Sequence, residues 1–233
     1  HAIAYLPMVV AAVLYTYRGK MLLGGVLTAL TVALELYANH LQITYYLVLM
    51  LLLIGVVQFV KDLKTNNVAD FAKRTGILVI AALLASCTSL TRLATTMEYG
   101  KDSTRGKSEL TDNLDNKTSG LDKDYATSWS YGIAESFTLL IPNFHGGASQ
   151  GALTTDSETY QAIKRAPNAK QLIKQLPLYW GAQPFTSGPT YAGSIVIFLF
   201  VLGLLFVKAE MRIWLLLATI LSIMLAWGKY FMP

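Results

Sequence analysis

Long apolar runs alternate with short polar connections along this chain. The runs fall at about residues 2–17, 20–37, 42–60, 76–92, 191–208 and 212–228. A membrane-spanning helix needs about 20 predominantly apolar residues, so all the runs but the first are long enough to span with little tilt. Helices are favoured over open strands because backbone polar groups in lipid must be satisfied internally. The pattern predicts an all-α membrane protein with about six transmembrane helices.

The polar connections predict which ends of these helices face the cytoplasm. Basic residues occupy three of them: Arg18 and Lys20, then Lys61, Lys64, Lys73 and Arg74, then Lys208 and Arg212. The turn 38–41 carries no Lys or Arg, and in the segment from about 94 to 190 the charges nearly balance. By the positive-inside rule the three basic connections are cytoplasmic, whereas the turn and the long segment face outward. One alternating path through the membrane satisfies every connection.

This path divides the chain into four transmembrane helices in 1–93, a periplasmic segment at 94–190 and two further transmembrane helices in 191–233. Within the periplasmic segment, 97–124 is expected to be a loop, and 133–141 a half-buried or re-entrant helix that stops at Pro142. Two short helices are expected at 156–166 and 168–176, separated by Pro167, with Asp156 or Ser157 as the first N-cap. On the cytoplasmic side, 61–74 is expected to form a short surface helix or a solvated loop.

Composition agrees with a membrane protein. Hydrophobic residues make up 54% of the 233 residues and charged residues only 14%, against about 25% charged in soluble domains. A soluble protein with buried core helices is the alternative that the run lengths disfavour. The single cysteine, Cys87, can form no internal disulfide. Because the chain opens on His1 and runs directly into an apolar stretch, we expect it to be an interior piece of a longer protein.

Polar residues in membrane spans usually face an interior or a cavity, which makes a few of them candidates for binding. Glu35 lies about one turn from the outward end of the second run, with His40 and Gln42 close behind it. Such a cluster could bind a substrate hydroxyl or phosphate, or carry a proton. The alternative is a carboxylate hydrated near the interface, with His40 acting only as a helix cap.

Further candidates follow along the chain. Arg92, at the outward end of the fourth run, could meet an anionic headgroup or a carrier phosphate, or could snorkel to the outer headgroups. Glu98 and Arg105 lie in a charged stretch suited to acid–base chemistry or anion binding, or to a solvated loop. Trp129 and Glu135 lie in an aromatic stretch and complete the set of candidate substrate-binding residues.

Several familiar chemical signatures are missing from the sequence. There is no P-loop, no GxGxxG, no HExxH and no CxxC pair, and the three histidines are widely scattered. No metal site, catalytic residue, cofactor or nucleic-acid partner is therefore assigned. A divalent metal, if the whole protein uses one, would be held by residues outside this piece.

Four stretches resemble YfhO-type membrane proteins, the last three their Bacteroidetes branch. They are Glu35-Leu36-Tyr37-Ala38-Asn39-His40-Leu41-Gln42-Ile43-Thr44-Tyr45-Tyr46, Ser103-Thr104-Arg105-Gly106-Lys107-Ser108-Glu109-Leu110, 129–147 and 179–189. These proteins have a glycosyltransferase-C (GT-C) type architecture, which implies many helices with outward loops. The resemblance implies an inner-membrane enzyme that moves sugar from a polyprenyl-phosphate carrier to an envelope polymer, lipid or protein. The catalytic carboxylate of such enzymes usually lies in the first outward loop, upstream of this piece.

Two other functional classes stay open. A lipid-linked-sugar flippase or transporter would show internal repeats and helices broken near the membrane midplane, and no repeat is visible in the sequence. A non-catalytic envelope assembly subunit would use the outward segment as a binding module, and nothing in the sequence excludes it.

Overall fold

A computed structural model describes residues 2–101, 103, 123–184 and 190–231 of the chain. These residues are predominantly helical, as predicted, and the only β-type pairings among them are the isolated bridges Phe144–Gly146 and Gly151–Leu176. The chain forms two compact units, which are described separately below.

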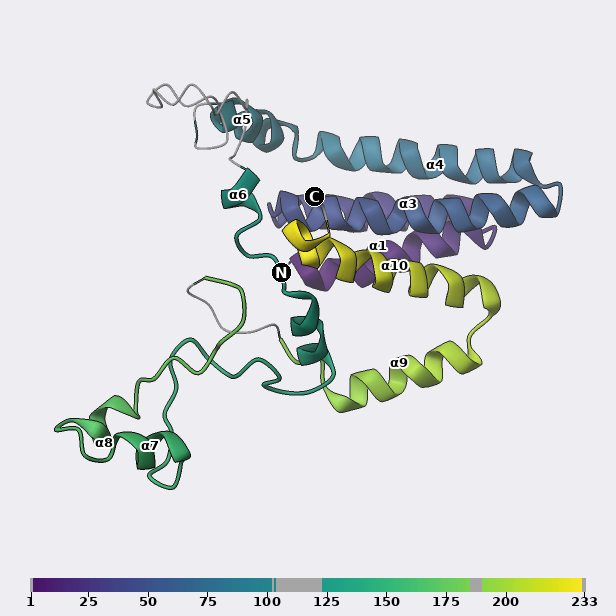
Figure 1. Ribbon diagram of the computed structural model, residues 1–233. Coiled ribbons are helices and arrows are strands. Elements are labelled where there is room, and N and C mark those ends of the chain that lie inside the picture. Colours follow the sequence, from purple (N-terminus) through teal and green to yellow (C-terminus); the bar gives the residue numbers. More distant parts are fainter. Residues whose placement is uncertain (1, 102, 104–122, 185–189, 232–233) are drawn as a thin grey trace. The chain divides into compact units, whose positions relative to one another are not determined.

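The first unit is a bundle of long helices. It contains α1 (Ala2–Tyr17), α2 (Met21–Tyr37), α3 (Leu41–Lys64), α4 (Val68–Cys87), α5 (Leu90–Lys101) and the first half of α10 (Ala209–Trp227), as far as Ala218. In Figure 1, α1, α3 and α4 run alongside one another. The buried core is formed by Val9, Val13, Tyr17, Leu47, Ile54, Trp214 and Ala218.

Tight turns connect the first four helices, and each turn contains a residue in the left-handed conformation. These residues are Gly19 (φ 93°), Asn39 (φ 54°) and Asn66 (φ 56°), which belong to the two residue types that adopt this conformation most easily. After α3, the Asn67 N–H donates to the Asp62 carbonyl at 2.7 Å and the Asn66 N–H to the Leu63 carbonyl at 3.2 Å. This paired arrangement is a Schellman motif, which ends α3 and reverses the chain.

Two consecutive glycines let α2 approach helices on two of its faces. A Cβ atom at Gly24 would lie 2.3 Å from the Thr16 hydroxyl oxygen and 2.8 Å from the Thr16 Cα, on α1. A Cβ at Gly25 would lie 2.7 Å from the Ile77 side chain, on α4. Small residues that allow close backbone approach are typical of helix contacts in membranes. Accordingly α2 packs mainly against α1 and α4, and much less against α3.

The region around α4 differs from the sequence-based expectation. Residues 61–74 form neither a separate surface helix nor a loop, because α3 continues to Lys64 and α4 already begins at Val68. The helix α5 also extends to Lys101, into the stretch that was expected to be a loop from residue 97. Between α4 and α5 the direction changes by 75°. There Ser86 and Thr88 donate to the carbonyls of Ala82 and Ala85, a pattern that competes with helical hydrogen bonding and bends helices.

Length and composition identify the helices that can cross a bilayer. Among the described residues, Leu41–Lys64 and Ala209–Tyr230 are long and apolar enough to do so, and a third candidate arises if α4 and α5 are one broken span. The apolar helices α1, α2 and α9 (Ser194–Phe206) are shorter, at 16, 17 and 13 residues. At 1.5 Å per residue they reach about 20–26 Å, less than the ~30 Å hydrocarbon core.

The second unit contains the short helices and the end of α10. Its elements are α6 (Lys123–Ala126), the 3₁₀ helix η1 (Ile133–Leu139), α7 (Glu158–Ile163), α8 (Ala169–Leu172), α9, α10 from Thr219 onward and η2 (Gly228–Tyr230). The two short helices predicted on either side of Pro167 are present, and the Ser157 hydroxyl caps α7 by accepting from the Tyr160 N–H. The helix expected at 133–141 is a 3₁₀ helix.

Candidate functional site

The first candidate site lies at the turn between α2 and α3, and we call it the hairpin mouth (Glu35, Tyr37, His40, Thr44 and Arg92). Glu35 is completely buried within an otherwise apolar helix. Thr44, on α3, donates a hydrogen bond of 3.3 Å to its Oε1. The other carboxylate oxygen, Oε2, is buried and has no hydrogen-bond partner among the described residues. A buried acceptor in this state is costly, so the site has unused capacity to bind a donor.

Arg92 brings a positive charge to the same turn. It lies in the first turn of α5, beyond the bend, rather than at the end of a straight fourth helix. Its Nη1 donates to the Tyr37 carbonyl at 2.7 Å, and its guanidinium lies over the Tyr37 ring, 5.0 Å from the centroid. This contact holds the Arg92 cation at Tyr37, which is two positions after Glu35 in the sequence. Guanidinium groups are well suited to phosphate recognition.

The remaining residues predicted around this turn do not all join it. His40 precedes α3, but its side chain forms no capping hydrogen bond, so helix capping does not account for it. Gln42 points along α3, where its Nε2 donates to the Tyr46 hydroxyl at 3.1 Å. Glu98 is exposed on α5, and Arg105 lies outside the described residues.

The second unit contains another buried carboxylate, Glu135, at 1% exposure. Its Oε1 accepts from the Tyr179 hydroxyl at 2.8 Å and from the Ala182 N–H, while Oε2 has no partner among the described residues. A Cβ atom at Gly181 would lie 2.0 Å from this Oε1. A glycine is therefore required for the backbone to pass so close to the carboxylate.

Tyr179 completes this arrangement. Its hydroxyl accepts from the Gln183 N–H at 2.9 Å while it donates to Glu135. Burial, together with the adjacent Glu135 carboxylate, raises the pKa of Tyr179 to about 12, so the phenol stays neutral and keeps donating. Trp129 belongs to the same cluster through its carbonyl, which accepts from Gln183 Nε2 at 3.1 Å. Trp129 and Glu135, predicted from one aromatic stretch, are thus linked through Tyr179 and Gln183.

His145 is a half-buried residue that the sequence did not single out. Its imidazole lies against Trp180 with 4.4 Å between ring centroids and 44° between the ring planes, and its two buried ring nitrogens have no hydrogen-bond partner among the described residues. Within the described ranges no three His, Cys, Asp or Glu side chains lie close enough together to hold a metal ion.

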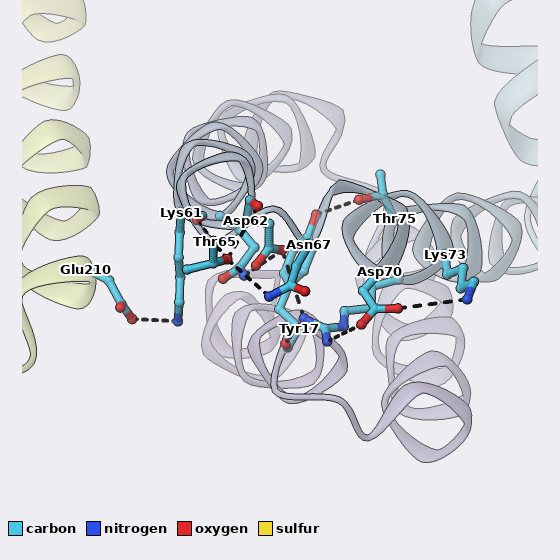
Figure 2. Close-up of polar contacts among 11 residues, drawn as sticks. Tyr17, Lys61, Asp62, Thr65, Asn67, Asp70, Lys73, Thr75 and Glu210 are labelled. Carbon is cyan, nitrogen blue, oxygen red and sulfur yellow. Dashed lines mark hydrogen bonds and ion pairs between the residues drawn. The ribbon is translucent and has the colours of Figure 1, made fainter.

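A polar network that sequence reasoning missed lies at the other end of the first unit, and Figure 2 shows it. Asp62 is 4% exposed, accepts from Gln58 Nε2 at 2.9 Å and lies 3.9 Å from Arg74 Nη1. Arg74 Nη1 also donates to the Tyr17 carbonyl at 3.1 Å, and Lys61 pairs with Glu210 at 2.9 Å. The network therefore joins α1, α3, α4 and α10 at the ends that carry the basic connections.

No family model, curated protein or solved structure matches this chain. The hairpin mouth is the stronger candidate, because it combines an under-bonded buried carboxylate with a cation from a different helix. The Glu135 cluster also contains a buried, under-bonded carboxylate, but no cation is found among the described residues that contact it.

Proposed function

We propose that this chain is part of a GT-C-like, YfhO-type membrane glycosyltransferase of the bacterial inner membrane. The donor would be a sugar on a polyprenyl-phosphate carrier, and the acceptor an envelope polymer, lipid or protein on the periplasmic side. The observations that carry the proposal are two features of the hairpin mouth: the buried, under-bonded carboxylate of Glu35, and the cation that Arg92 brings to Tyr37. A carboxylate can accept from a sugar or acceptor hydroxyl, and a guanidinium can bind the carrier phosphate.

The contacts at the two ends of the first unit support the multi-pass path with about six spans. The three basic connections meet at one end, through Arg74 with Tyr17 and Lys61 with Glu210. The uncharged turn after α2 and the beginning of α5 meet at the other, through Arg92 and Tyr37. Segregated in this way, the basic residues would face the cytoplasm together, and the hairpin mouth would face the periplasm.

In this proposal Glu35 and Arg92 line the carrier or acceptor site, and the catalytic carboxylate lies elsewhere in the whole protein. Glu35 would orient an acceptor hydroxyl, since its free oxygen lies at a helix end and not in the middle of the bundle. Arg92 would stabilise the carrier phosphate that departs when the sugar is transferred. Trp129 and Glu135 would contribute to a periplasmic binding surface.

Transport of a lipid-linked sugar is the competing function, and the bend between α4 and α5 bears on it. Transporters often bind substrate at helices broken near the membrane midplane. Here Asp70, Lys73 and Arg74 lie at the basic end of α4, so the break follows only the 13 residues from Thr75 to Cys87, or about 20 Å of helix inside the ~30 Å hydrocarbon core. The break by itself therefore does not separate transport from sugar transfer, and the assay below does.

The test is transfer of radiolabelled sugar from polyprenyl-phosphate donors in membranes containing the full-length protein. Glu35→Gln and Arg92→Ala should each lower transfer by at least about tenfold, since each removes a hydrogen-bonding or charged partner. Glu210→Gln and Lys64→Ala, at the opposite end of the unit, are matched controls that should retain transfer. Absence of transfer by the folded wild-type protein with several donors would favour a transporter or an assembly subunit.

A further inference from the structure

An apolar groove runs along the first unit and is lined by α1, α2, α3 and α4. Its volume is about 450 Å³, within the range of small-molecule sites in proteins. The walls come from α3 between Val48 and Phe59 and from α4 between Phe71 and Ala82. Among the lining residues only Tyr17, Thr28 and Thr75 carry a polar side chain. A groove with such walls suits a hydrocarbon chain.

The length of the groove matches one leaflet of a bilayer. Each wall covers 11 steps along its helix, or about 16 Å at 1.5 Å per residue. This is about half of the ~30 Å hydrocarbon core. Leu52 and Val56 on one wall and Val79 on the other are more than half exposed, so the groove is open to the surrounding lipid along its rim.

Polar groups gather at only one end of the groove. There the Tyr17 hydroxyl and the Thr75 hydroxyl share a hydrogen bond of 3.2 Å (Figure 2), and Arg74 is the residue immediately before Thr75. The Nε of Arg74 is buried and has no hydrogen-bond partner among the described residues. The far end, near Val48 and Ala82, is lined by apolar residues alone. The groove is therefore amphipathic along its length.

The charge balance at the polar end is positive. Among α1 to α4, the charged residues at this end are Arg18, Lys20, Lys61, Lys64, Lys73 and Arg74, set against Asp62 and Asp70. Asp62 and Asp70 both lie within 4 Å of Arg74, and Asp70 also pairs with Lys73 at 3.9 Å. The surplus of cations attracts anionic headgroups at the membrane surface.

We propose that this groove binds one acyl chain of an anionic bilayer phospholipid, with its phosphate beside Arg74 and Lys73. The lipid belongs to the leaflet on the side of the basic connections, at the opposite end of the unit from the hairpin mouth. It is therefore distinct from the carrier lipid of the proposed enzyme, and it does not depend on sugar transfer. Bound there, the chain fills a gap between α3 and α4 that side chains leave open.

Gly55 provides a way to fill the groove without changing a charged residue. A Cβ at this position would meet only the Tyr17 hydroxyl, at 3.8 Å, so Gly55→Leu would project its side chain into the groove. Gly76 offers a matched control, because a Cβ there meets nothing within 4 Å and the residue is not part of the lining. The same substitution can thus be compared inside and outside the site.

The experiment is native mass spectrometry of the full-length protein with phosphatidylglycerol, phosphatidylethanolamine or polyprenyl phosphate. The wild type and Gly76→Leu should retain phosphatidylglycerol in preference to the other two lipids. Gly55→Leu should retain about tenfold less phosphatidylglycerol, because its side chain fills the groove. The double variant with Arg18→Gln and Lys73→Gln should lose the preference for phosphatidylglycerol. Unchanged binding by Gly55→Leu, or preferential retention of polyprenyl phosphate, would overturn the proposal.

A second measurement keeps the proposal testable if Gly55→Leu does not fold. Leu52→Trp places a fluorophore on the groove wall, and Leu83→Trp places one on an exposed position of α4 outside the lining. Phosphatidylglycerol with brominated acyl chains, added at one lipid per protein in detergent, should quench the added fluorescence of Leu52→Trp selectively. Equal quenching of both variants would contradict a defined chain site.

Discussion

Asp62 and Arg74 face each other across the turn between α3 and α4, with 3.9 Å between Oδ2 and Nη1. Their side chains are 6% and 20% exposed, whereas those of the shorter Lys61–Glu210 pair are 41% and 50% exposed. Removing one partner of a buried pair leaves the other charge without compensation, which costs far more than breaking an exposed pair. The Asp62–Arg74 pair should therefore be the more costly one to break, although its two atoms lie farther apart than those of Lys61 and Glu210.

We predict that Asp62→Ala lowers the free energy of unfolding by about 2–4 kcal/mol, because Arg74 and Gln58 lose a buried acceptor. Glu210→Ala, which breaks the exposed pair, should cost less than about 1 kcal/mol. Thermal unfolding of the purified protein in detergent, followed by circular dichroism, compares the two. Equal losses in both variants would contradict a buried role for Asp62.

Close packing of α2 gives a second prediction. Gly24→Ala places a methyl group within 2.8 Å of the α1 backbone at Thr16, so the helices must move apart, at a cost of about 1–3 kcal/mol. Gly76→Ala, which has open space around it, should leave stability unchanged or raise it slightly, since Ala is the better helix former. The same unfolding measurement separates them, and a tolerant Gly24 would show that α1 and α2 do not meet there.

The raised pKa of Tyr179 predicts an alkaline transition in the second unit. Its neutral phenol is favoured in the folded state, so the stabilisation is complete below pH 10 and is lost as pH rises towards about 12. Titration of tyrosinate absorbance should show a late-titrating group near pH 12 that is absent in Tyr179→Phe. A wild type and a Tyr179→Phe variant with identical titrations would exclude the buried hydrogen bond to Glu135.

The membrane orientation can be tested by cysteine labelling in intact cells, starting from Cys87→Ser. A cysteine at Lys164, in the second unit, should react with a membrane-impermeant reagent added outside the cytoplasmic membrane. A cysteine at Lys64, at the basic end of the first unit, should react only after the membrane is opened. Reaction of Lys64→Cys from outside would reverse the proposed topology.

The sequence predicted the local features of the fold because these depend on neighbouring residues. The apolar runs indicated helices at 2–17 and 20–37, and helices lie there; Ser157 and Pro167 indicated the short helices α7 and α8. The start of α4 was missed because Asp70, Lys73 and Arg74 interrupt its apolar residues, and these charged side chains are used in the network around Asp62. Only the continuous apolar run from about residue 76 was predicted as part of this helix, α4.

The clusters were harder to predict, since they join residues far apart in sequence. Glu35 and its turn were visible as a charge in an apolar run, whereas the link from Arg92 to Tyr37 spans 55 positions. Tyr179 is 44 positions from Glu135, and nothing in either stretch indicates the other as its partner. Without related sequences in which paired positions vary together, such contacts follow only from the folded chain.

The adjacent glycines of α2 also constrain how the first unit assembles. Because Gly24 and Gly25 face α1 and α4, the central helix of the bundle rests on a partner that is synthesised two helices later. As the chain leaves the ribosome, α1 and α2 can pair at once, but the second face of α2 stays uncovered until α4 has been inserted. A chain truncated after α3 should therefore expose that face of α2 and be degraded by membrane proteases. Insertion of α4 is the step that completes the packing of α2.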